Sequence, residues 1–150
     1  MEDLSDQWHI QIKDCVTQYS DKKTKLWSFE VKILINRSNV REAFFQAVSN
    51  SSWANFGYLV ASEIEGTDTL KELRILTSLH GIGFIKLEAE NPSESQIIIP
   101  AKERFEVDWN TANRLTEENK DFLEYIKLIR QFYQTGDIRS DDWDNTSNKN

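Results

Sequence analysis

The segment from Leu26 to Ile35 constrains the fold of this chain more than any other part of the sequence. It reads Leu-Trp-Ser-Phe-Glu-Val-Lys-Ile-Leu-Ile and is rich in β-branched and aromatic residues, which favour strands. Its apolar and polar side chains alternate: Trp27, Phe29, Val31 and Ile33 fall on one side, and Ser28, Glu30 and Lys32 on the other. Because successive side chains of a strand leave opposite faces, we predict a strand with Glu30 and Lys32 on one face.

Helical and strand patterns alternate after this strand. Apolar residues between Val40 and Val48 recur with the spacing of a helix that buries one face, behind an Asn39–Glu42 capping box. Phe56–Ala61 and Ile82–Leu87 are short apolar runs of strand type. Between them we expect a second helix, opened by a capping box at Thr69 and ended by Gly81.

This order favours right-handed crossovers that join parallel neighbouring strands. Parallel sheets are normally covered on both faces, which would explain the nearly continuous apolar runs. We therefore expect an α/β fold with a mixed sheet, whose parallel crossover strands are flanked by helices.

The two ends of the chain are less regular. His9–Val16 is compatible with a strand or a short helix, and Gln96–Ile99 with a further strand ended by Pro100. We expect Thr116 to cap a long final helix that runs to Gly136, with an apolar stripe that forms core or a dimer face. Residues 1–136 are predicted to be one domain, and residues 137–150 a disordered tail, because that segment is polar and lacks periodicity.

Composition removes several classes of protein. The net charge of −7 argues against a chain that coats nucleic acid nonspecifically. Cys15 is the single cysteine, so we expect neither a disulfide framework nor a cysteine-based metal site. No apolar run approaches the ~20 residues of a membrane span. We expect a cytoplasmic protein without membrane contact.

Glu30 and Lys32 are the first candidates for chemistry, because burying unpaired charges on an apolar strand is costly. One explanation is a salt bridge or a solvated sheet edge. The other is a Mg²⁺ or Mn²⁺ site, since hard cations bind carboxylate oxygens and adjacent carbonyls. In that case the lysine would orient an attacking water or stabilise developing charge. Spacing alone leaves both explanations open.

Longer stretches around these residues carry a resemblance. They are Leu26–Lys32, Asn39–Asn55, Gly57–Ala61 and Leu79–Ile85. In the order and identity of their residues they resemble the PD-(D/E)XK restriction-endonuclease-like superfamily. Within it they resemble a bacterial family of predicted restriction-like proteins that often carry an N-terminal winged-helix domain. The similarity extends from Leu26 to about Gly136. It implies a restriction-endonuclease-like core, in which the acidic strand is followed by a crossover helix.

The resemblance implies roles for three residues: Glu30 as a metal ligand, Lys32 as the catalytic lysine, and Gln46 as the helix glutamine aimed at the site. Gln46 is equally compatible with a solvated surface position. The superfamily also needs an aspartate on the preceding strand, usually in a Pro-Asp dipeptide, which this sequence lacks. Asp14 would serve as the second metal ligand if its segment is a strand, and Asp3, Asp6 and Asp21 are poorer candidates. Alternatively, the chain is a fragment that lacks the first core strand.

Two functions follow as expectations. The first is a Mg²⁺- or Mn²⁺-dependent DNA endonuclease that hydrolyses phosphodiester bonds. The alternative is a catalytically inactive nuclease-like module that binds DNA or protein, which the missing Pro-Asp and the acidic net charge favour. A winged-helix domain of a longer chain and a second copy of this chain are the other expected partners.

Overall fold

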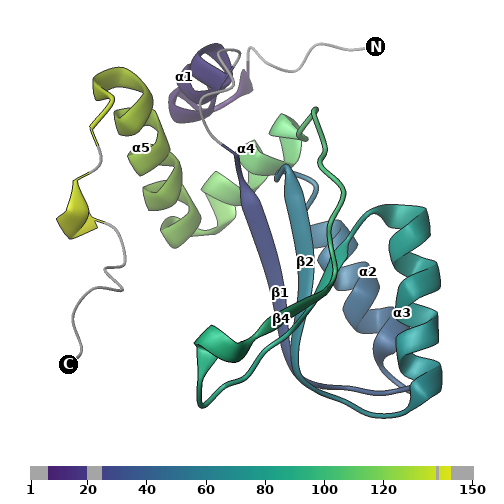
Figure 1. Ribbon diagram of the computed structural model, residues 1–150. Coiled ribbons are helices and arrows are strands. Elements are labelled where there is room, and N and C mark those ends of the chain that lie inside the picture. The colour runs from purple at the N-terminus through teal and green to yellow at the C-terminus, as the bar shows by residue number, and fades with distance from the viewer. Residues whose placement is uncertain (1–6, 20–24, 138, 143–150) are drawn as a thin grey trace. The chain divides into compact units, whose positions relative to one another are not determined.

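A computed structural model of the chain describes residues 7–19, 25–137 and 139–142. The chain divides into two compact units (Figure 1). We call Lys25–Asp108 the sheet unit, and the helices before Thr24 and from Trp109 onward the helical unit. The predicted α/β class with a mixed, helix-flanked sheet is confirmed.

Strands and helices alternate in the sheet unit. In chain order they are β1 (Trp27–Ile35), α2 (Val40–Asn50), β2 (Phe56–Ile64), α3 (Thr67–His80), β3 (Gly83–Lys86), the 3-10 turn η2 (Pro92–Glu94) and β4 (Gln96–Ile99). The strands lie side by side in the order β1-β2-β3-β4. β1, β2 and β3 are parallel, and β4 runs antiparallel to β3. The predicted parallel crossovers are therefore confirmed.

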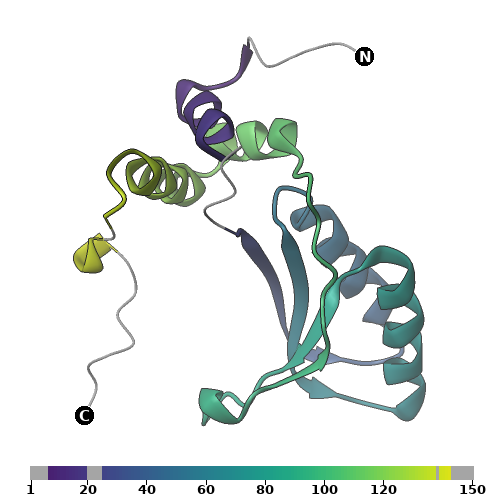
Figure 2. The ribbon, with the colours of Figure 1, turned by 45° about the horizontal axis from the view of Figure 1, so that its top comes forward.

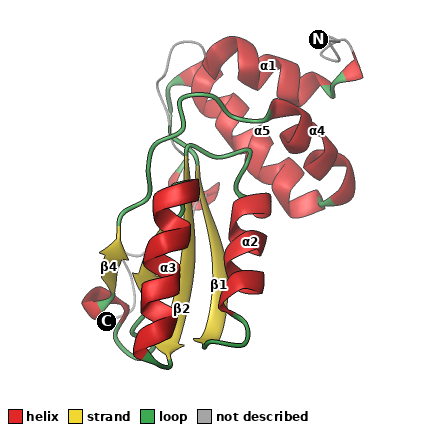
Figure 3. Ribbon diagram, turned by 90° about the vertical axis from the view of Figure 1, so that its right-hand side faces the viewer, coloured by secondary structure: helices red, strands yellow, loops and turns green. Residues whose placement is uncertain are grey.

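Both crossover helices lie on the same side of the sheet, as Figure 3 shows for α2 and α3 in front of β1 and β2. The core of the sheet unit forms between these helices and the strands. Phe44 of α2 and Leu73 of α3 are fully buried there, against Leu59 and Ala61 of β2. Burial of this apolar layer is the main stabilisation of the unit.

The prediction that the sheet is buried on both faces is wrong for β1. On the face away from α2 and α3, the side chains of Phe29, Val31 and Ile33 are 51%, 59% and 82% exposed. The reason is topological. Right-handed crossovers that always step in the same direction, from β1 to β2 to β3, place every connecting helix on one side. Covering the second face would require a reversal of strand order, as in doubly wound folds.

The helix ends differ from the predicted caps in detail. α3 begins at Thr67 after Gly66, so Thr69 lies inside the helix, where its hydroxyl donates to the Glu65 carbonyl. Asn39 does precede α2, but its side chain does not cap the helix: it accepts from the Asn36 N–H and donates to the Leu34 carbonyl of β1. Gly81 ends α3 as predicted, with the positive φ of 74° that favours glycine.

The helical unit contains α1 (Ile10–Tyr19), α4 (Trp109–Glu118), α5 (Lys120–Thr135) and the 3-10 turn η3 (Ser140–Asp142) (Figure 2). Of the two forms that the sequence allowed for His9–Val16, the helix is present. Thr116 does not cap the final helix. It lies within α4, and Asn119 caps α5 by accepting from two backbone N–H groups.

The apolar stripe of α5 contributes to the core of this unit, since Ile126, Ile129 and Tyr133 are buried. Of the predicted disordered tail, residues 138 and 143–150 lie outside the described part of the chain. None of the helices in the described part combines the length and apolar character that a membrane span requires.

Candidate functional site

Glu30 and Lys32 leave β1 on the face that α2 covers. Their partners across the parallel ladder are Leu59 and Ala61 of β2, which belong to the core on that side. The predicted common face of the two charged residues is therefore confirmed. β1 lies at the edge of the sheet, so both side chains sit at the margin of the core, where Glu30 and Lys32 keep partial contact with solvent.

The carboxylate of Glu30 binds two groups of the same unit. Lys32 Nζ lies 2.8 Å from one carboxylate oxygen, and Asn50 Nδ2 donates to the other over 3.0 Å. The Asn50 carbonyl accepts in turn from the Ser28 hydroxyl over 3.2 Å, which fastens the end of α2 to β1. Partial burial raises the pKa of Glu30, but the hydrogen bonds from Lys32 and Asn50 outweigh it and hold the pKa below 4.5.

Lys32 and Gln46 line one small hollow of about 170 Å³, together with Asn39, Glu42 and Ala43. The structure thus brings together two of the three residues that the resemblance assigned to catalysis. The side-chain oxygen of Gln46 is buried and accepts no hydrogen bond within the described residues. Gln46 is consequently not the fully solvated surface glutamine that the sequence also allowed.

A divalent cation needs several hard oxygen ligands, and the described residues do not assemble them. β2, the strand that follows β1 in the chain, offers only Leu59 and Ala61 beside Glu30 and Lys32, and within the described residues no strand precedes β1 to supply the expected aspartate. Within the described residues there is no group of three or more histidine, cysteine, aspartate or glutamate side chains placed to hold a metal. The arrangement around Glu30 therefore does not fit the expected Mg²⁺ or Mn²⁺.

Asp14 is not on a strand next to Glu30. It lies in α1 of the helical unit, where its carboxylate is 2.7 Å from Arg130 Nε of α5. The condition on which its role as a metal ligand depended, a strand at His9–Val16, is not met, because the segment carries a helical pattern around the buried Ile12 and Cys15. Asp3, Asp6 and Asp21 lie outside the described residues.

The turn after α2 holds the sheet unit together. Asn55 is 1% exposed; it accepts from the Leu26 N–H and donates to the Arg104 carbonyl. Arg104 in turn donates to the carbonyl and hydroxyl of Ser51, and its burial lowers the pKa of its guanidinium. These buried bonds give the turn a structural role.

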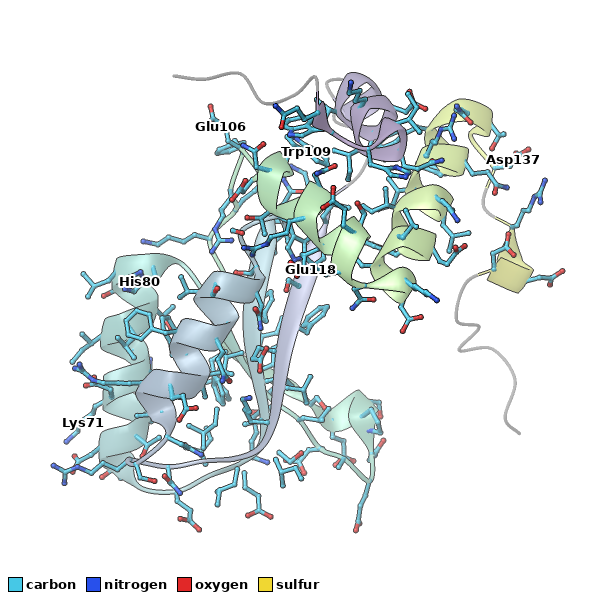
Figure 4. All side chains as sticks on the ribbon, turned by 180° about the vertical axis from the view of Figure 1, so that it is seen from behind. Lys71, His80, Glu106, Trp109, Glu118 and Asp137 are labelled. Carbon is cyan, nitrogen blue, oxygen red and sulfur yellow. The ribbon has the colours of Figure 1, made fainter. Side chains whose placement is uncertain are left out.

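His80 is the last residue of α3, and Figure 4 shows it at the other end of this helix from Lys71. Its ring contacts Phe44 and Phe45 of α2 at centroid distances of 5.9 and 5.3 Å. These contacts and its place in the last turn of the helix explain it as a structural residue.

The uncovered face of the sheet is the feature that sequence reasoning missed. We call it the open face, and its exposed members are Trp27, Phe29, Val31, Ile33 and Ile97. The ladder pairs Val31 with Val60, Val60 with Ile85 and Ile85 with Ile97, but Val60 is only 6% exposed, so the exposed part of this face lies on β1 and at Ile97 of β4. Tyr58 stacks against both Trp27 and Phe29, at centroid distances of 5.9 and 6.0 Å. Exposed apolar patches of this kind mark interaction surfaces.

Comparison with protein-family models, with curated proteins and with solved structures finds no match to this chain. Membership of the PD-(D/E)XK superfamily, a winged-helix partner domain, a bacterial origin and a cytoplasmic location therefore stay predictions.

Proposed function

We propose that this chain is a catalytically inactive, nuclease-like module that binds a protein partner. The observation that carries the proposal is the state of Glu30. Its two carboxylate oxygens are bound by Lys32 and Asn50, and the paired strand β2 adds only the apolar Leu59 and Ala61 beside them. A carboxylate in this setting stabilises the α2–β1 contact and is poorly placed to bind a cation.

The open face supports protein as the partner rather than DNA. All four β1 positions that face this side and are exposed, Trp27, Phe29, Val31 and Ile33, carry aromatic or aliphatic side chains. Aromatic residues are enriched in the centres of protein interfaces, whereas DNA affinity depends on cationic contacts to phosphates. The net charge of −7 further disfavours DNA.

The test is a metal titration joined to a cleavage assay. We expect no change in melting temperature and no cutting of plasmid DNA with millimolar Mg²⁺ or Mn²⁺. The Glu30→Ala/Lys32→Ala double variant is the matched control. Cutting by the wild-type chain that this variant loses would overturn the proposal.

A second candidate is the metal-dependent DNA endonuclease, which hydrolyses a phosphodiester with water. It is favoured by the shared hollow of Lys32 and Gln46, where the glutamine oxygen lacks a partner within the described residues. This function would need at least one more acid beside Glu30, and Glu42 lines the same hollow as Lys32 and Gln46. The same cleavage assay separates it from the binding module.

A further inference from the structure

Within the described residues, no strand pairs with the outer edge of β1. Within the described residues β1 pairs with β2 alone, and its nine residues make it one of the two longest strands of the sheet. A long edge with an exposed apolar face is a template for pairing with another strand. Proteins commonly protect such edges with very short strands, bulges or proline.

The backbone groups of β1 that face this edge can be assigned. The Leu26 carbonyl accepts from the Phe56 N–H over 3.1 Å, so the peptide groups of Leu26 point toward β2. Because successive residues of a strand point their N–H and C=O groups to alternate sides, those of Phe29 and Val31 point outward. Val31, at the centre of β1, thus points its backbone N–H and C=O toward any added strand, and neither pairs with another strand within the described residues.

We propose that the added strand is β1 of a second copy, antiparallel, with a two-fold axis at Val31. This inference rests on the proposed function and names the partner. In this register Glu30 lies opposite Lys32 of the second copy, and Lys32 opposite its Glu30. On the open face Phe29 lies opposite Ile33 of the second copy. Opposite charges and aromatic–β-branched pairs are the favourable cross-strand combinations.

Other registers lack this complementarity. A parallel, in-register pairing places each Glu30 beside Glu30 and each Lys32 beside Lys32. An axis moved to Glu30 or to Lys32 places that residue opposite its own copy. Like charges opposite each other destabilise a sheet, so the charge pattern selects the axis at Val31. The resulting interface is self-complementary, as a two-fold dimer requires.

Cysteine crosslinking tests the register in the intact chain. Val31→Cys would place two cysteines opposite each other on the axis, about 5.5 Å apart at Cα, within the range of a disulfide. Ile33→Cys is the matched control, because it is exposed on the same face of the same strand. In the dimer the two substituted residues would be offset by four residues along the strands, roughly 13 Å, which is too far for a disulfide. Wild type controls for the buried Cys15.

We expect a disulfide-linked dimer with Val31→Cys and at least a tenfold lower yield with Ile33→Cys and with wild type. Equal yields for the two variants, or no dimer with either, would overturn the proposed register.

A charge exchange tests the complementarity. Glu30→Lys and Lys32→Glu each place like charges together in the homodimer, so we expect about tenfold weaker dimerisation of each in analytical ultracentrifugation. Mixing the two variants restores both opposite-charge pairs, and so does the double variant Glu30→Lys/Lys32→Glu. Circular dichroism checks that each variant is folded. Failure of both the mixture and the double variant to recover wild-type association would contradict the inference.

The outcomes for the two proposals are distinguishable. A monomeric chain that neither binds metal nor cuts DNA would refute the second copy as partner and leave the inactive binding module standing. A dimer that cuts DNA would support the second copy as partner and refute the proposal that the module is inactive.

Discussion

Lys32 Nζ lies 2.8 Å from Glu30 Oε1, and the two residues stand on the same face of the same edge strand. The spacing of two along a strand brings them together without any contribution from another element. Asn50 of α2 donates a hydrogen bond to the other carboxylate oxygen of Glu30. The pair that resembles a nuclease motif is thus neutralised within the sheet unit.

The pH dependence of stability should report this arrangement. Glu30 has a folded-state pKa below 4.5, so its contribution is fully present above that value and is lost as pH falls through the folded pKa. We expect Glu30→Gln to destabilise the chain most near neutral pH, with the difference from wild type shrinking below about pH 4.5. Urea denaturation across pH 2.5–7.5 measures the free energy of unfolding of both variants and of wild type. Glu90→Gln, at an exposed site, is the control; an identical pH profile for both variants would contradict the prediction.

Gln46→Met tests whether Gln46 is a structural residue. Its buried side-chain oxygen accepts no hydrogen bond within the described residues, so replacing it with a similar apolar side chain removes a desolvation cost. We expect unchanged stability or a gain of up to about 1 kcal/mol. Gln11→Met is the control. Because Gln11 accepts a hydrogen bond from Arg130 over 3.0 Å, this variant should be less stable than wild type. A loss at Gln46 equal to that at Gln11 would show that the oxygen has a partner in solution.

Asn55→Asp should destabilise the sheet unit. The substitution keeps the shape of the side chain but replaces the donor to the Arg104 carbonyl with a second acceptor, at a site that is 1% exposed. We expect a loss of about 2 kcal/mol, because a buried carbonyl is left unsatisfied. Chemical denaturation measures it against Asn110→Asp, an exposed control whose side-chain oxygen accepts from Trp8 and can still do so as a carboxylate. Equal effects at the two sites would refute the structural role of Asn55.

Gly83→Ala should destabilise by overpacking. An added Cβ would lie 2.3 Å from the Tyr58 ring and 2.6 Å from the Ala101 backbone nitrogen. The backbone contact cannot be relieved by a side-chain rotation, so we expect a loss of about 1–3 kcal/mol. At Gly136 an added Cβ meets nothing within 4 Å, so Gly136→Ala reports only the cost of its positive φ. Unchanged stability of Gly83→Ala in chemical denaturation would contradict the expected crowding.

The alternation of β1 and the helical spacing after Val40 were sufficient to predict two of the main elements of the sheet unit and the face that Glu30 and Lys32 share. These patterns depend on local geometry, which the sequence carries directly. The long final helix was predicted too far toward the N-terminus, because the extended backbone of Asn119 interrupts α4 and α5 without a proline or glycine to signal it.

The contact of Asn50 with Glu30 could not be predicted from the sequence. Helical spacing places Asn50 on the same flank as Gln46, but the register of α2 over β1 depends on how Phe44 and the other core residues pack. The same holds for Asp14, whose partner Arg130 is distant in sequence and close only in the folded helical unit.

The sequence by itself determined that Trp27, Phe29, Val31 and Ile33 share one face of a strand, because that depends only on the two-residue period of a β-strand. Only the tertiary structure decided that this face is open and that the edge of β1 is unpaired within the described residues. Both outcomes follow from the direction in which successive crossovers step, which places both helices on one side of the sheet and leaves the first strand at its margin. Periodicity carries no information about that direction.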